Sequence, residues 1–315
     1  MVFSKCSHYL KVIAFHNPHL GSEKWSLSHA QMPTPFVNDE GVGVLFTTRD
    51  SSKLSRISFV QLDHSTKKIL SKSRNQPILD IGPRNGFDSK GVMSSSMLEF
   101  DGKKYLFYIG WNTHDIYPYD LNVGMAISTN GLSFARSSRE TPIIISDHST
   151  FKFITTPFVA PMGKGYQMLF SAGGEWVMHS NRWESTYSIA SVESTDLFQW
   201  SISNVSEYSL TIAGKSQARP TLAIIGGQKH LIYSERDNLN FRVGQGGYKI
   251  KIQRIMPSGN WNDCEVIFEK NEMFDQYLKN MQCYPFPIEI AGKLYLFLNG
   301  DEFGKFGFAV AEVLN

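Results

Sequence analysis

One nineteen-residue phrase occurs twice in this chain, and this repetition constrains the fold more than any other feature. Residues 32–50 read MPTPFVNDEGVGVLFTTRD, and residues 219–237 read RPTLAIIGGQKHLIYSERD. Each copy runs through an apolar segment, turns at a polar stretch containing glycine, and runs apolar again before an Arg-Asp pair. Apolar arms joined by a glycine-containing turn are typical of a β-hairpin. Internal repetition has to be settled first, since it decides the fold class.

Three weaker copies of the same hairpin follow the template. They are SSSMLEFDGKKYLFYIGWN (94–112), TTPFVAPMGKGYQMLFSAGGEW (155–176) and CYPFPIEIAGKLYLFLNGD (283–301). Each hairpin is followed by another strand-like run, such as SRISFVQLD or KFGFAVAEV, and most of these runs reach one more short aromatic or aliphatic segment. A hairpin plus two further strands, repeated along the chain, is the pattern of a propeller with four-stranded blades.

The last repeat ends after its third strand, so the ring needs a strand from elsewhere. The N-terminal run YLKVIAF (9–15) can supply it. The sequence therefore predicts an all-β fold, a five-bladed β-propeller with four-stranded blades whose ring is closed by the N-terminal strand. Residues 1–315 are expected to form this single domain, because closed all-β architectures commonly run long and no Pro/Ser-rich linker interrupts the chain.

Charge and hydropathy exclude several classes of partner. The net charge is +2 and the basic residues are scattered, which argues against nucleic acid. No window reaches the apolar length of a membrane helix, and Lys5, His8 and Lys11 interrupt the N-terminus as a signal-peptide core. The oligomeric state stays open.

The three cysteines, Cys6, Cys264 and Cys283, lack the spacing of metal ligands. We interpret them as reduced thiols, which together with the missing signal favours the cytoplasm. No cofactor and no metal site is predicted. The alternative is Ca²⁺ in the ring channel, where oxygen ligands are plentiful.

Propeller topology predicts where the chemistry lies. The starts of the first strands, the ends of the second strands and the loops entering each blade should meet at one central pocket. Polar and aromatic residues at these places are Arg219 and Tyr284 (starts), Arg49, Asp50, Trp111, Glu175, Trp176, Glu235, Arg236 and Asn299 (ends), and His29, Asp88 and Asp275 (loops).

This combination suits a sugar ligand. Aromatic faces cover the C–H surface of a pyranose, and planar groups take paired hydroxyls. Paired carboxylates supply a general acid and a base or nucleophile, and we assign that role to Asp88, Asp275, Glu235 and Asp50. The other nine candidates are assigned to substrate binding. A structural alternative stays open for several of them: Arg-Asp pairs also form structural salt bridges, Asp88 and Asp275 also cap turns, and tryptophans also pack blades.

The pattern over nearly the whole chain, with GPRNGFDSKGV, GMAISTNGLSF, LIYSERD and YPFPIEIAGKLYLFLNGDEFGKFGFAVAEV, resembles the five-bladed propeller glycosidase superfamily, which includes glycoside hydrolase families 32, 43, 68, 117 and 130. It looks closest to uncharacterised hydrolase-like proteins of surface-polysaccharide gene clusters. The resemblance implies a carbohydrate-active enzyme, first of all a glycoside hydrolase acting on a glycan or sugar conjugate.

The chain departs from that superfamily at the catalytic positions. Members similar to families 32 and 43 carry acidic residues at the starts of the inner strands, whereas this chain has Met32-Pro33-Thr34, Ser94-Ser95-Ser96 and Thr155-Thr156. Two alternatives therefore stay open. One is a glycosyltransferase or phosphorylase in which Arg49, Arg219 and Arg236 bind the phosphate of a nucleotide sugar or free phosphate. The other is a propeller that binds glycan without catalysis.

Overall fold

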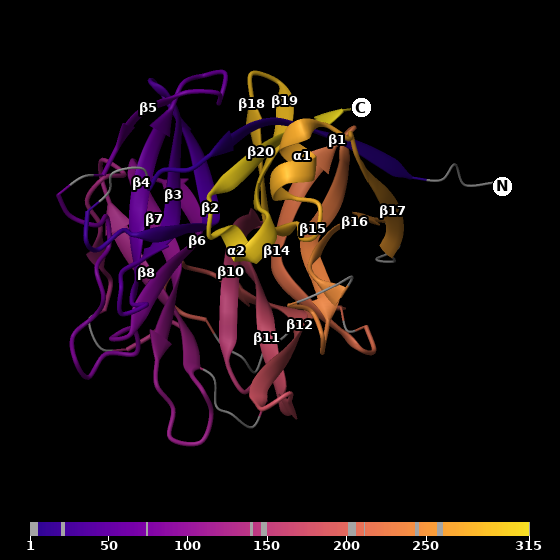
Figure 1. The fold of residues 1–315 in the computed structure, drawn as a ribbon. Helices are drawn as coiled ribbons and strands as arrows, with labels where there is room; N and C mark the ends of the chain where they lie inside the picture. Colours follow the sequence, from indigo (N-terminus) through magenta and orange to yellow (C-terminus); the bar gives the residue numbers. More distant parts are fainter. Residues whose placement is uncertain are drawn as a thin grey trace.

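The structure is a computed structural model and describes residues 6–19, 23–73, 75–138, 141–145, 150–200, 206–210, 212–242, 246–256 and 261–314. Strands make up most of it, and the helices of the described residues are two short ones, α1 (Glu272–Tyr277) and α2 (Asp301–Gly304) (Figure 1). The prediction of an all-β chain is confirmed. Within the described residues, neither helix has the length or the apolar character that crossing a membrane requires.

The strands form three sheets. The first contains β2 (Ser28–Asn38), β3 (Gly41–Arg49), β4 (Ser55–Leu62), β6 (Gly91–Phe100), β7 (Lys103–Asn112), β8 (Asp120–Ser128) and β9 (Ala135–Arg136) in that order, with β5 (Ile69–Lys72) paired to β4. The second contains β10 (Ile154–Met162), β11 (Gly165–His179), β12 (Arg182–Ser194) and β13 (Ser206–Leu210). The third runs in the order β14 (Lys215–Ile225), β15 (Gln228–Asp237), β16 (Lys249–Ile255), β17 (Trp261–Phe268), β1 (Ser7–His16), β20 (Phe308–Leu314), β19 (Lys293–Asn299) and β18 (Cys283–Ile290).

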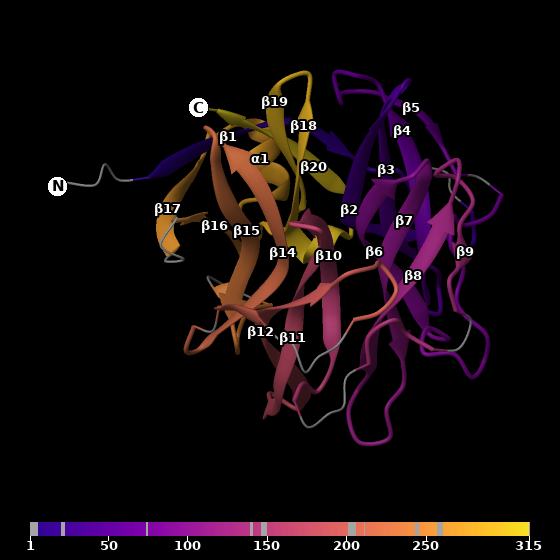
Figure 2. The ribbon, with the colours of Figure 1, turned by 180° about the vertical axis from the view of Figure 1, so that it is seen from behind.

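Each predicted hairpin is an antiparallel pair in the structure: β2–β3, β6–β7, β10–β11, β14–β15 and β18–β19. The first strands of these pairs lie beside one another in a closed circle, because β2 contacts β6, β6 contacts β10, β10 contacts β14, β14 contacts β18 and β18 contacts β2. Figures 1 and 2 show the sheets arranged around these strands. The repeated phrase therefore encodes the strands at the centre of the molecule.

The proline near the start of the repeated phrase lies at a bulge in the strand. In four of the central strands the ladder register shifts at a residue with positive φ followed by proline: Met32 (54°), Thr156 (53°), Arg219 (53°) and Tyr284 (56°). Such a shift is a β-bulge, and proline, which has no N–H to donate, is confined within sheets to bulges and edges. In β6 a register shift between Ser94 and Ser96 stands at the same place without proline.

Apolar clusters between neighbouring groups of strands hold the circle together. Phe107 of β7 packs with Phe170 of β11, and Ile232 of β15 packs with Leu296 of β19. All four side chains are completely buried. Burial of such a side chain stabilises the fold by roughly 1.5–3 kcal/mol. Because these contacts join different repeats, each repeat depends on its neighbours.

Strand β1 joins the two ends of the chain. It pairs antiparallel with β20 and parallel with β17, so the indigo N-terminal strand lies between the yellow and orange strands (Figures 1 and 2). The parallel pairing brings Cys6 next to Cys264, and the two form a disulfide. The prediction that all the cysteines are reduced thiols is therefore wrong for this pair, which lies 258 positions apart in sequence. Cys283 is a buried free thiol.

Candidate functional site

The strand registers bring the predicted starts and ends to one face of the molecule. Arg49 at the end of β3 pairs with Ser28 at the start of β2, and Trp111 pairs with Gly91 in the same way. Likewise Asp237 pairs with Lys215, and Asn299 pairs with Cys283. This agrees with the expectation that these positions share a face.

Arg219 lies where the central strands meet. Its Nη1 donates a hydrogen bond to the carbonyl oxygen of Tyr284 at 2.8 Å, and its Nη2 donates to the carbonyl oxygens of Pro33 at 2.8 Å and Ser95 at 3.2 Å. These acceptors belong to β18, β2 and β6. The side chain is 1% exposed, and burial lowers the pKa of the guanidinium to about 9. The sequence predicted that Arg219 binds substrate, and in the structure its fork binds the bulged backbones of other strands.

Asn299 fastens β19 to β2. Its Oδ1 accepts a hydrogen bond from the backbone N–H of Met32 at 2.7 Å, and its Nδ2 donates to the carbonyl oxygens of Ala30 at 2.8 Å and Gly307 at 3.0 Å. The residue is completely buried. The amide predicted to bind substrate is thus bonded to backbone at both ends and holds Met32 in its positive-φ conformation.

Five half-buried aromatic residues pack against one buried cluster, and we call the five the axial mouth: Trp111, Tyr119, Trp176, Tyr187 and Tyr284. They pack on a buried floor that includes Met32, Met93 and Phe153. The rings of Tyr119 and Trp176 have centroids 4.7 Å apart, as do those of Tyr119 and Trp111. Trp111 and Trp176, the two predicted tryptophans, therefore lie in the same cluster.

Two arginines act electrostatically on Tyr284 of the axial mouth. Burial, the largest effect, raises the pKa of Tyr284 well above its usual value, and the charges of Arg236 and Arg49 lower it. Arg49 is half-buried and donates to Gln31 Oε1 at 2.7 Å. Burial lowers its pKa, so a negative charge placed beside it would be favoured.

Arg236 is bound more completely than Arg49. Its Nε donates to the hydroxyl oxygens of Tyr187 at 3.0 Å and Tyr248 at 3.2 Å, and its Nη2 donates to the Ser185 carbonyl at 2.6 Å. The guanidinium also lies 3.6 Å from the ring centre of Phe241, a cation–π contact. The side chain is therefore positioned to orient the hydroxyls of Tyr187 and Tyr248, which are hydrogen-bonded to each other.

Arg242, also close to the axial mouth, forms an ion pair with Glu184. Arg242 donates to both carboxylate oxygens of Glu184, from Nε at 2.9 Å and from Nη2 at 3.0 Å. This bidentate pair is the geometry in which Arg binds carboxylates most strongly. Arg242 also lines a cavity of about 310 Å³ together with Phe241, Gly247, Asn280, Met281, Asp301 and Glu302.

Two of the four predicted acids are bound to structural partners. The Asp50 carboxylate accepts from the backbone N–H groups of Ser52 and Leu54 and from Arg56 Nη1 at 2.7 Å. The Asp88 carboxylate is completely buried, and its Oδ2 accepts from Tyr108 at 3.0 Å and Arg136 at 2.8 Å. The structure therefore does not bring either acid to the axial mouth.

The other two predicted acids differ in their surroundings. Glu235 is 9% exposed, its Oε1 lies 3.9 Å from Lys251 Nζ, and its Oε2 is buried with no hydrogen-bond partner in the described part of the chain. Asp275 is exposed in the first turn of α1, where Asn271 caps the helix.

Glu175 and His29 complete the predicted set. Glu175 is exposed beside Trp176, and its backbone N–H donates to Thr186 Oγ1 at 2.8 Å. His29 has a positive φ of 68°, and its Nδ1 lies 2.9 Å from Ser28 Oγ. Burial lowers the pKa of His29 to about 3, and Arg49 adds to this effect. His29 is therefore a neutral imidazole that lies close to Arg49.

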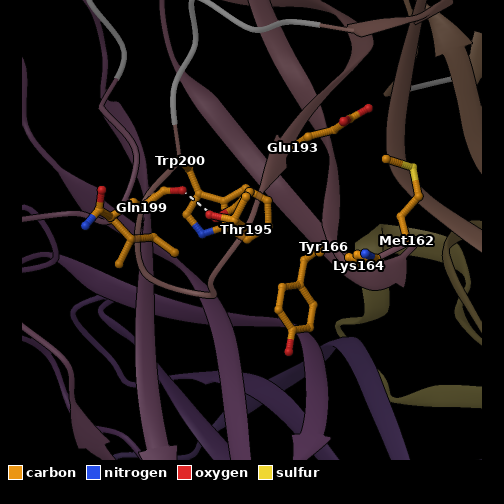
Figure 3. A pocket seen from close by; sticks show the side chains of 10 residues that line it. Met162, Lys164, Tyr166, Glu193, Thr195, Gln199 and Trp200 are labelled. Atoms are coloured by element: carbon orange, nitrogen blue, oxygen red, sulfur yellow. Dashed lines mark hydrogen bonds between the residues drawn. The ribbon is translucent and has the colours of Figure 1, made fainter.

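A different cavity lies at the turn from β10 to β11 and at the end of β12. It has a volume of about 800 Å³ and is lined by ten residues, among them Met162 at the end of β10, Glu193 and Trp200. Figure 3 shows Tyr166, Glu193 and Trp200 around this space. None of the predicted site residues lines it.

Sequence reasoning missed several residues of the site. The repeated hairpins predict none of these residues, because two lie on β12, the third strand of its sheet, and two lie before β16: Glu184, Tyr187, Arg242 and Tyr248. The absence of a metal site stays a prediction, with Ca²⁺ in the ring channel as its alternative, and the guanidinium of Arg219 would repel a cation placed beside it.

Comparison with known proteins extends these observations to the fold. No family model matches the chain. Two curated relatives from Mycobacterium tuberculosis, the uncharacterized proteins MT1551 and Rv1502, are each 24% identical over 297 residues, which is 94% of this chain and 96% of theirs.

Among solved structures, a glycoside hydrolase superposes with a TM-score of 0.70 at 13% identity, over 98% of this chain and 92% of its own. A thermostable family-43 glycoside hydrolase gives 0.63 at 11% identity, over 91% and 89%. A protein of the GH130 family, described as mannoside phosphorylases that contain glycoside hydrolases targeting β-1,2 mannosidic linkages, gives 0.66 at 12% identity, over 100% and 95%. The chain therefore has the propeller-like fold of these proteins.

Proposed function

We propose that this protein is a carbohydrate-active enzyme of the glycosidase type, and that a glycan or sugar conjugate binds at the axial mouth. The observation that carries the proposal is the packing of Trp111, Trp176 and Tyr284 around one floor, with Arg49 beside them. Aromatic faces take the apolar face of a sugar, and a few fixed polar groups orient it. The fold shared with glycoside hydrolases supports the same class.

The architecture that we infer is a five-bladed propeller. The circle of central strands supports five repeats, and the pairing of β1 with β20 supports a fifth blade completed by the N-terminal strand. In this architecture the axial mouth is the opening of the central channel, and Arg219 fills the channel behind it.

For binding, we propose that Arg49 contacts an anionic group of the substrate. Within the described residues the one hydrogen bond of its side chain goes to Gln31, so further N–H groups of its fork are left to a ligand. Trp111 and Trp176 would cover the sugar ring. Arg236 would act by orienting Tyr187, and Glu175 and His29 lie at the rim.

For the chemical step, we propose Glu235 as the acid or base, because its Oε2 is buried without a hydrogen-bond partner in the described part of the chain and its ion-pair partner there, Lys251, is 3.9 Å away. The Oδ1 of Asp88 is also unbonded there, but Arg136 binds the other oxygen of that carboxylate. Asp275 remains a weaker candidate in an exposed helix turn. For Asp88 and Asp50 we propose structural roles, since Arg136 and Arg56 bind them.

A transferase or phosphorylase is the second candidate. One observation favours this candidate. Arginines lie close to the axial mouth, and Glu184, a carboxylate near it, is bound by Arg242. Arginine suits phosphate, so the donor would be a nucleotide sugar or free phosphate. Nucleotide sugars are cytoplasmic donors, so this candidate goes with the cytoplasm as the proposed location, whereas the Cys6–Cys264 disulfide is typical of an oxidising compartment.

The test is a product screen by mass spectrometry of the full chain against oligosaccharides and nucleotide sugars, with and without phosphate. We expect Trp176→Ala to lower kcat/KM at least tenfold, because a stacking face is lost. The matched control is Phe198→Ala, an exposed aromatic outside the axial mouth, which should leave kcat/KM unchanged.

The outcomes separate the alternatives. Turnover in plain buffer that Glu235→Gln abolishes supports the hydrolase, and turnover only with phosphate or a nucleotide sugar supports the transferase or phosphorylase. Equal effects of Trp176→Ala and Phe198→Ala would contradict the location of the site. Glycan binding without any product would contradict an enzyme and leave a binding protein.

A further inference from the structure

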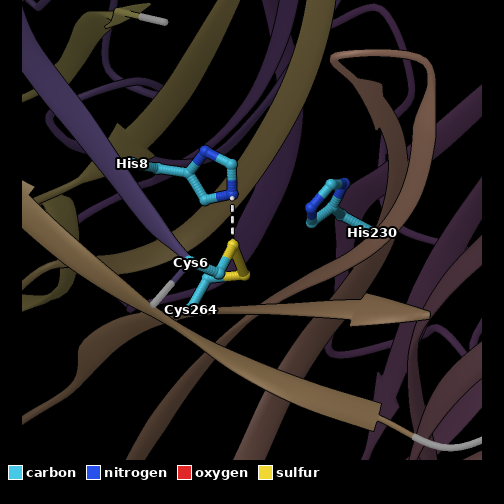
Figure 4. Close-up of side chains that lie close together, drawn as sticks. All are labelled: Cys6, His8, His230 and Cys264. Carbon is cyan, nitrogen blue, oxygen red and sulfur yellow. Dashed lines mark hydrogen bonds between the residues drawn. A yellow bond between two sulfur atoms is a disulfide. The ribbon is translucent and has the colours of Figure 1, made fainter. Parts of the chain in front are cut away.

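Four potential metal ligands converge at the outer edge of the molecule, far in sequence from one another. Cys6 and His8 come from the N-terminal segment and β1, His230 comes from β15, and Cys264 comes from β17. One ligand atom of each, a sulfur or a ring nitrogen, lies within 4.8 Å of all the others. Figure 4 shows the two imidazole rings next to the sulfur pair. We call these residues the Cys2His2 cluster.

His230 is oriented as a metal ligand would be. Its Nδ1 lies 2.9 Å from the carbonyl oxygen of Gln228. A carbonyl only accepts, so Nδ1 carries the hydrogen and Nε2 carries the lone pair. Nε2 is buried, the residue is 1% exposed, and no hydrogen-bond partner for this nitrogen lies in the described part of the chain. Metal-binding histidines have this arrangement, with one nitrogen bonded to a carbonyl and the other free for the ion.

The remaining ligands face the same space. His8 Nε2 lies 3.5 Å from Cys6 Sγ, and the rings of His8 and His230 have centroids 5.1 Å apart. Arg254 Nη2 lies 3.3 Å from the same sulfur. A guanidinium beside a cysteine favours the thiolate, which is the form that binds metal. The same guanidinium repels a cation, and the two negative sulfurs of the reduced cluster offset that repulsion.

We propose that the Cys2His2 cluster binds one Zn²⁺ ion when the Cys6–Cys264 disulfide is reduced, so that the disulfide and the metal are alternative fastenings of the N-terminal strand. Two thiolates and two neutral imidazoles form a tetrahedral donor set that suits zinc, and two negative sulfurs balance the charge of the ion. This site lies outside the axial mouth and does not depend on the proposed function.

The exchange between the two states balances with a thiol reductant. Two reductant thiols reduce the disulfide, giving two cysteine thiols and one oxidised reductant disulfide. Zn²⁺ then replaces the two thiol protons, which go to solvent, and two zinc–sulfur bonds form. In the oxidised state the sulfurs are bonded to each other and are not thiolates, so the ion has no site.

The consequence concerns the closure of the chain. The cluster joins β1 to β17 and β15, at the place where the N-terminal strand meets strands from the other end of the sequence. In a reducing environment the disulfide is lost, and β1 would be held there by its strand pairing alone. A zinc ion that binds only the folded arrangement restores the cross-link and stabilises the folded state.

The experiment uses the full chain, reduced while folded with a phosphine, and measures free thiols, bound zinc and the spectrum with Co²⁺ in place of zinc. We expect one zinc ion per reduced chain, none per oxidised chain, and the visible bands of tetrahedral cobalt with thiolate ligands. His230→Gln keeps both cysteines and should weaken zinc binding at least roughly a hundredfold, since even outer partners of a metal site are worth 10–100-fold.

Two controls make the result decisive. His16→Gln replaces a buried histidine at the other end of β1, which bonds Thr66, and should bind zinc like the unaltered chain. Circular dichroism and His8→Gln cover the case in which His230→Gln fails to fold. No zinc on the reduced chain, equal zinc affinity for His230→Gln, or a disulfide that resists reduction in the folded chain would each overturn the proposal.

Discussion

Replacing Arg219 tests whether this side chain holds the centre of the molecule together. Arg219→Met keeps most of the apolar volume and removes the hydrogen-bond donors, which leaves the carbonyl oxygens of Pro33, Ser95 and Tyr284 without their partner. These acceptors lie on three different strands. The change should therefore loosen contacts between repeats that are far apart in sequence.

The magnitude follows from the bonds. A hydrogen bond to a charged group contributes about 1.5–3 kcal/mol, so three such bonds contribute roughly 5–9 kcal/mol. Burial of the charge offsets part of this contribution, as the lowered pKa of Arg219 indicates. We expect the free energy of unfolding to fall by about 3–5 kcal/mol, the usual cost of removing one partner from a buried charged arrangement. Arg219→Lys loses the fork but keeps a charge. Its free energy of unfolding should lie between that of the unaltered chain and that of Arg219→Met.

The assay is equilibrium unfolding in guanidinium chloride, followed by tryptophan fluorescence and by circular dichroism. Arg84→Met, at an exposed arginine, is the matched control and should change stability by less than about 0.5 kcal/mol. A free energy of unfolding for Arg219→Met equal to that of the control would refute the assignment of Arg219 to the structural centre, and substrate binding would then be its better explanation.

Two further predictions concern the same face. Asn299→Ala removes the hydrogen bonds that hold Met32 and should lower the free energy of unfolding by about 2–4 kcal/mol. The same assay measures it, with Asn75→Ala at an exposed position as the control. Equal effects of the two changes would contradict the role of Asn299 in holding β19 to β2. His29 has a folded pKa of about 3, below the 6.5 of the free side chain, so the unfolded chain binds the extra proton first. Stability should therefore fall as pH decreases from 6.5 towards 3, and His29→Gln should flatten that slope in denaturant titrations; an unchanged slope would count against it.

The strands and hairpins were predictable from the sequence because they are local. Alternation of apolar residues, a glycine turn and a fixed order of strands are written in each repeat, and the copies at 32–50 and 219–237 reinforce each other. The face on which the candidate residues lie follows from strand direction, which is why the sequence predicts that Trp111, Trp176 and Tyr284 lie together, as they do in one cluster of the structure.

The state of the polar side chains was not predictable, because it depends on partners from other repeats. The sequence predicts Asp88 as a catalytic acid, whereas in the structure Arg136 and Tyr108 bind it. It predicts Arg219 as a substrate-binding residue, whereas the fork of Arg219 binds three other strands. Likewise Cys6 and Cys264 meet only because β1 returns to β17. The sequence by itself determined the repeating strands, since their signals are short-range, and tertiary structure alone decided which charges are buried and paired, since burial arises only when distant strands pack together.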